Sequence, residues 1–382
     1  MRRTNLKFFF DSFRNCCAVW FAFACFYPLG ASCDTSRPKL AATGGRNEKT
    51  RVIEFPAQGL GQYFVSERPE FMVIWPDQPK GQPAKGAVRV LEKADITLST
   101  GWGTGDNLPL LSHLRSDDIQ SLDLVGSNVT HASFKYICRL KGLKKLSLAG
   151  TYIDDRDIAV LAAGLPKLSQ LDLSDTPRIT DRCIDSILTM NHLTDLNLAR
   201  ERQLTDAGFM RLAAMKSLNS LDLTETRLSD KGLSSITKIQ TISALNLAHT
   251  KITDHGLQYL FGMPSLKLLD LSETGITDAG VQQVIGKLTM IEELNLSQTQ
   301  VTDKGISNLA GLVNLRKIWL RSLSKVTEAA IPALSSHSKL QDIEIQKTLI
   351  MRSGVDALAK ALPGCQVHSK SACKCRKRTR VN

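Results

Sequence analysis

Self-similarity with a period of 24 to 25 residues is the feature that most constrains what this chain can fold into. An apolar residue stands three positions before each of ten pairs of apolar residues two apart. These pairs are Leu122/Leu124, Leu146/Leu148, Leu171/Leu173, Leu196/Leu198, Leu221/Leu223, Leu245/Leu247, Leu269/Leu271, Leu294/Leu296, Ile318/Leu320 and Ile343/Ile345. Alternation over so few residues favours a short strand with one buried face, so we predict ten strands.

The second half of each unit changes to the spacing of an amphipathic helix. In residues 208–215 the apolar positions recur at steps of three and four. Thr205 suits an N-cap, because its hydroxyl can accept a hydrogen bond from a free backbone N–H, and Asp206 faces the positive end of the helix dipole. The same pair, a threonine or serine followed by aspartate, recurs at Thr180-Asp181, Ser229-Asp230, Thr253-Asp254, Thr277-Asp278 and Thr302-Asp303.

A column of small residues follows these helix starts. Glycine inside a helix costs about 1 kcal/mol relative to alanine, so its recurrence needs a physical reason. We expect close approach of a neighbouring backbone to be that reason, with Cys183 and Ala330 in the equivalent place elsewhere. The glycines are Gly208, Gly232, Gly256, Gly280 and Gly305.

One strand and one helix cannot bury their apolar faces alone, whereas stacked units form a continuous core. We therefore predict an α/β solenoid, a right-handed β-α superhelix with a parallel sheet on the concave side and helices on the convex side. The units resemble the leucine-rich repeat family, in particular exported bacterial members with units of the form Leu-x-x-Leu-x-Leu-x-x-Thr-x-Ile-Thr-Asp-x-Gly-Leu. This resemblance covers Ile119 to about Val367.

A threonine column falls where the wider family has Asn or Cys, which implies an internal ladder that satisfies backbone groups of a neighbouring turn. Glu201 and Leu323 replace threonine in this column, so we expect altered turns at residues 200–203 and 321–324. The threonines are Thr151, Thr176, Thr226, Thr250, Thr274, Thr299 and Thr348.

The rest of the chain divides around these repeats. We predict a linker or irregular segment over residues 33–86, with a small β element near Tyr63 to Trp75. Residues 87–118 form an N-terminal cap, which contains a strand-forming stretch and a short helix from Leu108 to Leu114. Repeats with a C-terminal cap cover residues 119–368, and a basic, disordered tail covers residues 369–382.

The N-terminus has the charged-then-apolar order of a secretory signal peptide, which we assign to residues 1–32. The apolar run from Cys16 to Leu29 falls short of the ~20 residues that span a bilayer. Small residues at Gly30 to Ser32 offer a cleavage site. An alternative is a lipoprotein signal with lipid on Cys33, although Leu29 lies one residue too early for that pattern. Soluble secretion and retention of the segment as a short anchor also stay open.

The net charge of +12 does not indicate a nucleic-acid partner, because most of the excess lies at the two ends of the chain. We recognise no set of catalytic residues, no phosphate-binding loop and no pair of histidines at metal-ligand spacing in the sequence. We therefore predict neither an enzyme nor a cofactor or metal. The basic residues at the ends are Arg2, Arg3, Lys7, Arg14, Lys370, Lys374, Arg376, Lys377, Arg378 and Arg380.

The central position of each strand, between the paired apolar residues, is the candidate binding column. Acids and amides alternate there, and we predict that they are exposed on the concave face and favour a protein partner with a cationic surface. Trp319 with nearby Arg321 is a candidate anchor, although the tryptophan could instead cover the end of the solenoid. The candidate residues are Asp172, Asn197, Asp222, Asn246, Asp270, Asn295, Trp319 and Arg321. The same residues could also serve only to solvate an exposed sheet.

These observations favour an exported binding scaffold of the periplasm, cell envelope or exterior. A second hypothesis is a structural protein attached to the envelope, through its N-terminus or through its basic tail on an anionic polymer or membrane surface. A third is a substrate-recruiting protein like the F-box proteins, whose repeats have a similar period. No F-box helices are recognisable before Ile119, and an exported chain would be in the wrong compartment for that role.

Overall fold

A computed structural model describes residues 49–66, 81–101 and 105–369 of the chain. The chain forms two compact units, Met1–Ser147 and Leu148–Asn382. The predicted signal peptide, Cys33 and the basic tail beyond Ser369 lie outside the described residues, so these assignments stay predictions.

The first unit contains the β structure that precedes the regular repeats. β1 pairs with β4 and β2 pairs with β3 and β5, all antiparallel, whereas β5, β6 and β7 run parallel to one another. The strands are β1 (Thr50–Phe55), β2 (Gln62–Ser66), β3 (Gln82–Pro83), β4 (Gly86–Leu91), β5 (Asp95–Ser99), β6 (Ser121–Asp123) and β7 (Lys145–Ser147). The helical turns are η1 (Gly105–His113), η2 (His131–Ser133) and α2 (Phe134–Ile137).

Part of the predicted linker is ordered β structure: β1 lies where we expected irregular chain, whereas β2 falls at the β element expected near Tyr63. Ile53 and Phe55 of β1 are buried, and the ring of Phe55 stacks on that of Tyr63 in β2 at 5.3 Å between centroids. Pro56, Gly59 and Gly61 lie in the connection between β1 and β2. The helix expected at Leu108 to Leu114 is the 3-10 helix η1, which includes Pro109.

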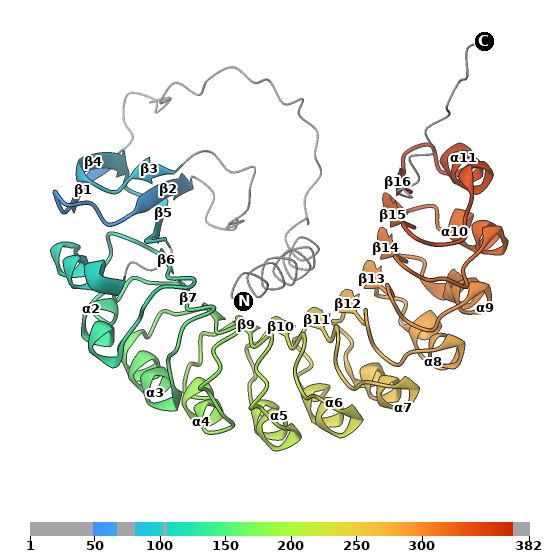
Figure 1. Ribbon diagram of the computed structural model, residues 1–382, viewed down its shortest axis with the longest axis horizontal. Coiled ribbons are helices and arrows are strands. Elements are labelled where there is room, and N and C mark those ends of the chain that lie inside the picture. The colour runs from blue at the N-terminus through green and yellow to red at the C-terminus, as the bar shows by residue number, and fades with distance from the viewer. Residues whose placement is uncertain (1–48, 67–80, 102–104, 370–382) are drawn as a thin grey trace, which may run out of the picture. The chain divides into compact units, whose positions relative to one another are not determined.

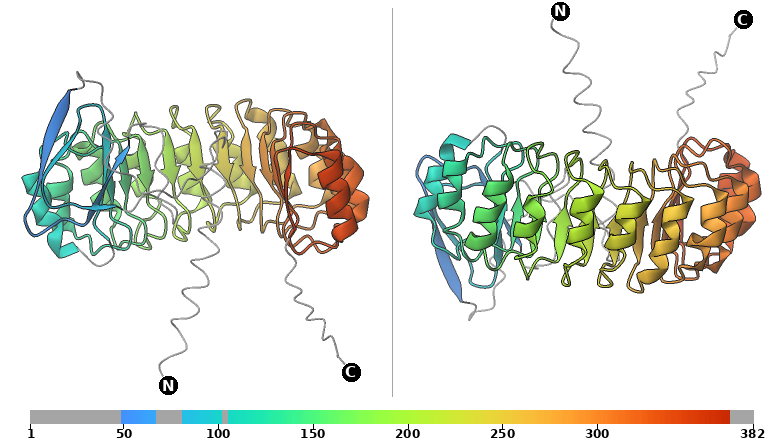
Figure 2. Two further views of the ribbon diagram at one scale, coloured as in Figure 1. Left: turned by 90° about the horizontal axis from the view of Figure 1, so that it is seen from above. Right: turned by 90° about the horizontal axis from the view of Figure 1, so that it is seen from below.

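The second unit repeats one strand and one helical segment (Figures 1 and 2). Nine parallel strands pair in chain order along the inner side of this unit, and its helices line the outer side. The strands are β8 (Gln170–Asp172), β9 (Asp195–Asn197), β10 (Ser220–Asp222), β11 (Ala244–Asn246), β12 (Leu268–Asp270), β13 (Glu293–Asn295), β14 (Lys317–Trp319), β15 (Asp342–Glu344) and β16 (Gln366–His368).

The helical segments of the second unit are short, and several end in a 3-10 turn. The α-helices are α3 (Asp155–Gly164), α4 (Cys183–Ile187), α5 (Asp206–Leu212), α6 (Asp230–Ile236), α7 (Asp254–Leu257), α8 (Asp278–Gln283), α9 (Asp303–Ser307), α10 (Ile331–Ser335) and α11 (Arg352–Ala361). The 3-10 turns are η3 (Gln258–Gly262), η4 (Ile285–Lys287), η5 (Asn308–Gly311) and η6 (Glu328–Ala330).

The paired apolar residues of the sequence form the core, as predicted. Leu196, Leu221 and Leu245 are direct neighbours in β9, β10 and β11, and each is buried. Each of the ten predicted pairs begins within one of the strands β6 to β15. Because side chains alternate along a strand, the neighbours of each buried residue point to the inner face, where a partner could contact them.

The aspartate after each N-cap residue bonds to the next repeat, which the sequence did not show. Asp230 accepts hydrogen bonds from the backbone N–H of Thr253 at 2.9 Å and from its hydroxyl at 2.6 Å. We call these contacts cap bridges. They join Asp155 to Thr180, Asp181 to Thr205, Asp206 to Ser229, Asp230 to Thr253, Asp254 to Thr277, Asp278 to Thr302 and Asp303 to Thr327.

The predicted N-caps are also present at five of the six positions, whereas α4 begins later, with Arg182 at its N-cap position instead of Thr180. The Thr205 hydroxyl accepts from the backbone N–H of Ala207 at 3.2 Å while it donates to Asp181. One hydroxyl therefore starts its own helix and ties that helix to the preceding repeat. A carboxylate accepting two hydrogen bonds makes charge-assisted contacts, which are stronger than those between neutral groups.

The carboxylates of the cap bridges are the close neighbours of the glycine column, although the bridges from Asp155 and Asp303 also form beside Cys183 and Ala330. A Cβ on Gly256 would lie 2.2 Å from Oδ1 of Asp230, and one on Gly208 would lie 2.3 Å from Oδ1 of Asp181. The expectation that a neighbouring backbone comes close is therefore wrong, because the close group is a side-chain carboxylate of the preceding repeat. The same contact occurs at Gly232, Gly280 and Gly305.

The threonine column satisfies backbone groups within its own turn, which corrects the expectation of a ladder between turns. The hydroxyl of Thr226 donates to the carbonyl of Leu223 at 2.7 Å, and each of the other six threonines makes the equivalent bond three residues back. In this column Glu201 does bridge two turns. Its Oε1 lies 2.6 Å from the backbone N and 3.0 Å from Oγ1 of Thr176.

Glu201 is fully buried, and its Oε2 has no hydrogen-bond partner. Burial raises the pKa of this carboxyl to about 8, against the opposing hydrogen bonds from Thr176. Arg200 and Ser322 come directly before Glu201 and Leu323, the two residues that stand in place of threonine. Both keep the same left-handed φ as their counterparts in other repeats. The replacements therefore leave that point of the turn unchanged.

The cap bridges predict strong coupling between Asp230 and Gly256. Gly256→Ala should destabilise the protein, because its Cβ would meet the carboxylate of Asp230. In an Asp230→Ala background that space is free, and the same change should instead stabilise by about 1 kcal/mol through helix propensity. Urea unfolding of the double-mutant cycle measures this coupling.

The matched control combines Asp230→Ala with Gly280→Ala, because Gly280 faces Asp254 instead of Asp230. We expect the two free-energy changes to add in that pair. Additive effects in the Asp230 and Gly256 pair would show that the carboxylate does not fill the space over the glycine.

Glu201 predicts a pH dependence of stability. The folded state keeps a proton that the unfolded state loses above pH 4.5, so stability should fall as pH rises from about 4.5 to about 8. Glu201→Gln removes this titration and should flatten the profile over that window. Urea unfolding at pH 5, 7 and 9 tests this, with Asp356→Asn on the exposed side of α11 as the control. An unchanged slope in Glu201→Gln would contradict a neutral Glu201.

Candidate binding face

The strands of the second unit bring the predicted binding column together. Asp172, Asn197 and Asp222 occupy the last position of β8, β9 and β10 and are direct neighbours in register. Asn246, Asp270, Asn295 and Trp319 continue the row through β11 to β14. Arg321 lies two residues after Trp319, in the turn that follows β14. The column therefore exists as one continuous row.

The polar groups of this row are largely occupied by the protein itself. Oδ1 of Asp222 accepts hydrogen bonds from the backbone N–H of Thr224 at 2.8 Å and from its hydroxyl at 2.6 Å. In the same way, Oδ1 of Asn197 and of Asn246 accepts a hydrogen bond from the backbone N–H two residues later in the chain. These bonds fasten the turn that leaves each strand.

The alternation of acids and amides has a structural cause. Nδ2 of Asn246 donates to Oδ2 of Asp222 at 3.2 Å, and Nδ2 of Asn295 donates to Oδ2 of Asp270 at 2.8 Å. An amide next to each acid supplies a donor where a second carboxylate would repel. The sequence pattern therefore reflects contacts between neighbouring strands as well as any contact with a partner.

The prediction that the whole column is exposed is wrong. Asn197, Asp222, Asn246 and Asp270 are buried, because their side chains lie against the strands and turns to which they bond. Burial raises the pKa of Asp222 to about 6 and also raises the pKa of Asp270 above its ordinary value. Asp172, Asn295, Trp319 and Arg321 are half-buried and stay within reach of a partner.

A second row, which the sequence analysis missed, lies in the turns that follow the strands. In eight successive repeats a residue other than glycine adopts a left-handed conformation, with φ between 55° and 65°. We call these residues the left-handed row. They are Asp175, Arg200, Glu225, His249, Glu273, Gln298, Ser322 and Lys347. A side chain in this conformation costs about 1–2 kcal/mol, which glycine avoids.

The backbone of the left-handed row extends the sheet by one residue. The N–H of Glu225 donates to the carbonyl of Ala248 at 3.0 Å, and that of His249 donates to the carbonyl of Ser272 at 2.8 Å. Gly150 makes the same bond to Ser174 at 2.9 Å. Glycine is therefore sufficient for the backbone role, and a signal was present in Gly126 and Gly150 at this position of earlier repeats.

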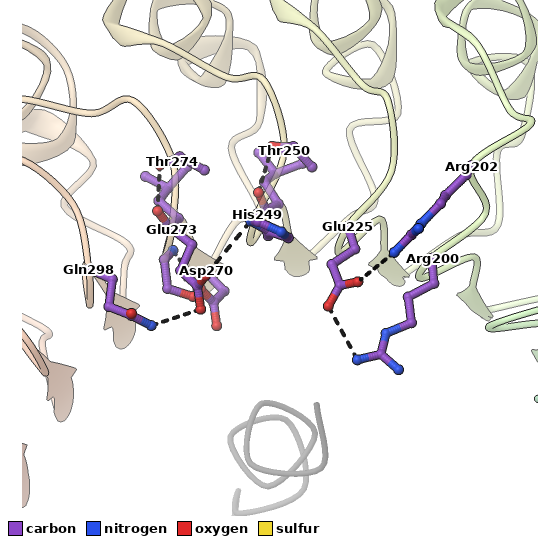
Figure 3. A network of polar contacts seen from close by, with 12 residues as sticks. Arg200, Arg202, Glu225, His249, Thr250, Asp270, Glu273, Thr274 and Gln298 are labelled. Carbon is purple, nitrogen blue, oxygen red and sulfur yellow. Dashed lines mark hydrogen bonds and ion pairs between the residues drawn. The ribbon is translucent and has the colours of Figure 1, made fainter. Parts of the chain in front are cut away.

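Side chains of the left-handed row form a polar network along the edge of the inner face (Figure 3). Oε1 of Glu225 lies 3.2 Å from Nη2 of Arg200, and its Oε2 lies 3.7 Å from Nη2 of Arg202. Oε1 of Glu273 accepts from Nε2 of Gln298 at 2.7 Å, and its Oε2 lies 3.7 Å from Nδ1 of His249. These contacts form two groups, one that joins two neighbouring repeats around Glu225 and one that joins three around Glu273.

Acidic residues predominate on the strands of the inner face. Every strand from β8 to β15 carries an acid except β11 and β14, and Lys317 of β14 is the single lysine or arginine among them. Nζ of Lys317 lies 3.0 Å from Oε1 of Glu293, whose Oε2 is buried without a hydrogen-bond partner. The strands of this face therefore carry more acidic than basic side chains.

No metal-binding cluster of His, Cys, Asp or Glu occurs among the described residues. Cys183 opens α4 and is buried, which raises the pKa of its thiol, and Cys138 caps α2. Within the same part of the chain, no helix is long and apolar enough to cross a membrane.

Comparison with known proteins gives one family model and similar solved structures. A family model described as Leucine Rich repeat matches residues 214–236, 238–261, 262–283 and 287–310. Among solved structures, an internalin (inlF) from Listeria monocytogenes is similar, with 19% identity, coverage of 72% of this chain and 78% of that chain, and a TM-score of 0.48.

An internalin C2 (inlC2) from the same organism has 24% identity, coverage of 57% of this chain and 84% of that chain, and a TM-score of 0.41. The four matched segments fall in consecutive repeats of the second unit, where strand, turn and helix recur with the same contacts. Four consecutive repeats of the second unit therefore match the leucine-rich repeat model.

Proposed function

We propose that this protein is a non-enzymatic scaffold that binds a protein partner with a cationic surface through the inner face of its second unit. The observation that carries this proposal is the acidic character of strands β8 to β15, where Lys317 is the single basic residue. Complementary charge across an interface raises the association rate and rejects partners of the wrong sign.

The accessible part of this face differs from the column that the sequence suggested. Asp172, Asp342 and Glu344 are half-buried strand acids that a partner can reach. Asp342 also lies 3.3 Å from Nε2 of His368, within a half-exposed pair. Trp319, half-buried between Asn295 and Glu344, adds an aromatic surface to the same end of the sheet.

We also propose that the scaffold is exported and acts in the periplasm, the cell envelope or the exterior. The support is the order of charged, apolar and small residues over residues 1–32. Mass spectrometry of the mature N-terminus tests this. A start after Ser32 agrees with export, a lipid-bearing start at Cys33 indicates anchoring, and an intact Met1 in the producing cell contradicts cleavage.

Binding of a fluorescein-labelled (Arg-Ser)6 peptide, followed by fluorescence anisotropy, tests the charge of the face. We expect the peptide to bind the full chain, with affinity that falls as salt rises, and we expect an equivalent (Glu-Ser)6 peptide not to bind. The variant Asp172→Asn/Asp342→Asn/Glu344→Gln should weaken binding by roughly tenfold, because each lost charge contributes a few tenths of a kcal/mol or more.

The matched control removes three exposed acids from the helical side, as Asp185→Asn/Glu328→Gln/Asp356→Asn. This variant has the same net charge as the first and should bind the cationic peptide as the unchanged chain does. Equal losses in both triple variants would mean that net charge, and not the inner face, attracts the peptide. Absence of binding to the unchanged chain would contradict the proposal directly.

A further inference from the structure

We infer that the basic tail, residues 370–382, folds back over the end of the inner face formed by β13 to β15 and occupies it as an internal ligand. A cationic partner must then displace the basic tail before it can bind. This inference rests on the proposed function, because the tail and the partner compete for the same carboxylates.

The first argument is the place where the basic tail begins. β16 is the terminal strand of the described sheet, and its last residue, His368, lies beside Glu344 of β15 in register. The tail starts two residues later. Its thirteen residues extend to about 43 Å at about 3.3 Å per residue, whereas β13 lies about 14 Å from β16 at a strand spacing of about 4.8 Å. The tail is therefore long enough to lie across all of these strands.

The second argument is charge complementarity. The strands β8 to β15 carry seven acids and one lysine, Lys317. The basic tail carries six cations and no acid, at Lys370, Lys374, Arg376, Lys377, Arg378 and Arg380. Charges in this number attract even where each exposed pair contributes little. A segment tethered to the sheet also meets these acids at a higher local concentration than a free peptide does.

The third argument is a buried acceptor without a donor, which does not depend on the charge of the surface. Glu293 precedes the buried Leu294 in β13, so its side chain points to the inner face. This side chain is 5% exposed, and its Oε1 lies 3.0 Å from Nζ of Lys317. Its Oε2 is buried and accepts no hydrogen bond from the described residues. A buried oxygen in this state is unfavourable, and a second cationic donor brought by a ligand satisfies it.

The same end of the sheet offers a surface for a guanidinium group. Trp319 of β14 is half-buried and lies next to Glu344 of β15. The face of a tryptophan ring attracts arginine. Arg376 follows Ser369 by seven residues, which extend to about 23 Å, so its side chain can reach this ring.

The test measures how the basic tail affects binding of the fluorescein-labelled (Arg-Ser)6 peptide to the full chain. The neutral-tail variant is Lys370→Gln/Lys374→Gln/Arg376→Gln/Lys377→Gln/Arg378→Gln/Arg380→Gln. A tethered segment has an effective concentration of about 1 mM, so a tail that binds the face with a Kd of about 0.1 mM weakens a competing peptide about tenfold. We therefore expect the neutral-tail variant to bind the peptide about tenfold more tightly than the unchanged chain.

The matched control keeps the tail and removes six exposed cations from the helical side, as Arg156→Gln/Lys231→Gln/Lys287→Gln/Lys304→Gln/Arg352→Gln/Lys360→Gln. It has the same net charge as the neutral-tail variant and should bind the peptide within twofold of the unchanged chain. Carbodiimide crosslinking, which joins lysine amines to carboxylates in contact, then locates the tail. We expect links from the tail lysines to Asp342 or Glu344 within one copy of the unchanged chain.

The outcomes separate this inference from the proposed function. Peptide affinities within twofold of each other for the unchanged chain and the neutral-tail variant overturn the inference and leave the proposed function standing. Equal gains in the neutral-tail variant and the control mean that net charge, and not the tail, is responsible, which also overturns it. So do tail crosslinks found only between two copies, or cosedimentation with phosphatidylserine vesicles without links to the inner face. If the peptide binds neither the unchanged chain nor the neutral-tail variant, the proposed function itself fails.

Discussion

The carboxylate of the aspartate that follows each N-cap residue is the group on which the repeat stack depends. It accepts two hydrogen bonds from the next repeat, as Asp230 does from Thr253. It also occupies the space that a side chain on Gly256 would need. One contact that recurs seven times therefore joins each helix start to the preceding repeat, and in five of these repeats a glycine leaves room for the carboxylate.

In this stack of repeats, the role of a polar residue depends on its position. Groups between the repeats, such as the threonine hydroxyls and Glu201, satisfy backbone groups inside the turns. Acids and amides at the ends of the strands fasten the turns and pair with one another across strands. The left-handed row, at the edge of the inner face, bonds to the next repeat through its backbone, a role that Gly150 performs without a side chain.

The sequence predicted what depends on local periodicity and missed what depends on the neighbouring repeat. Alternation located the strands, and Thr205 was recognised as an N-cap because a cap acts on its own helix. The bond from Thr205 to Asp181 spans 24 residues, so no local pattern indicates it. Exposure of the central column was overestimated for the same reason, since Asn246 meets Asp222 only after the strands pair.

Native-state hydrogen exchange measures the central claim most directly. The backbone N–H groups of Thr205, Thr253 and Thr302 belong to residues near the surface, yet each donates to a carboxylate of the preceding repeat. If the cap bridges hold the stack, these amides should exchange as slowly as those of the buried strands and open with the same free energy. Exchange as fast as that of Ala207 and His255, which follow the caps, would contradict the claim that carboxylates join the repeats.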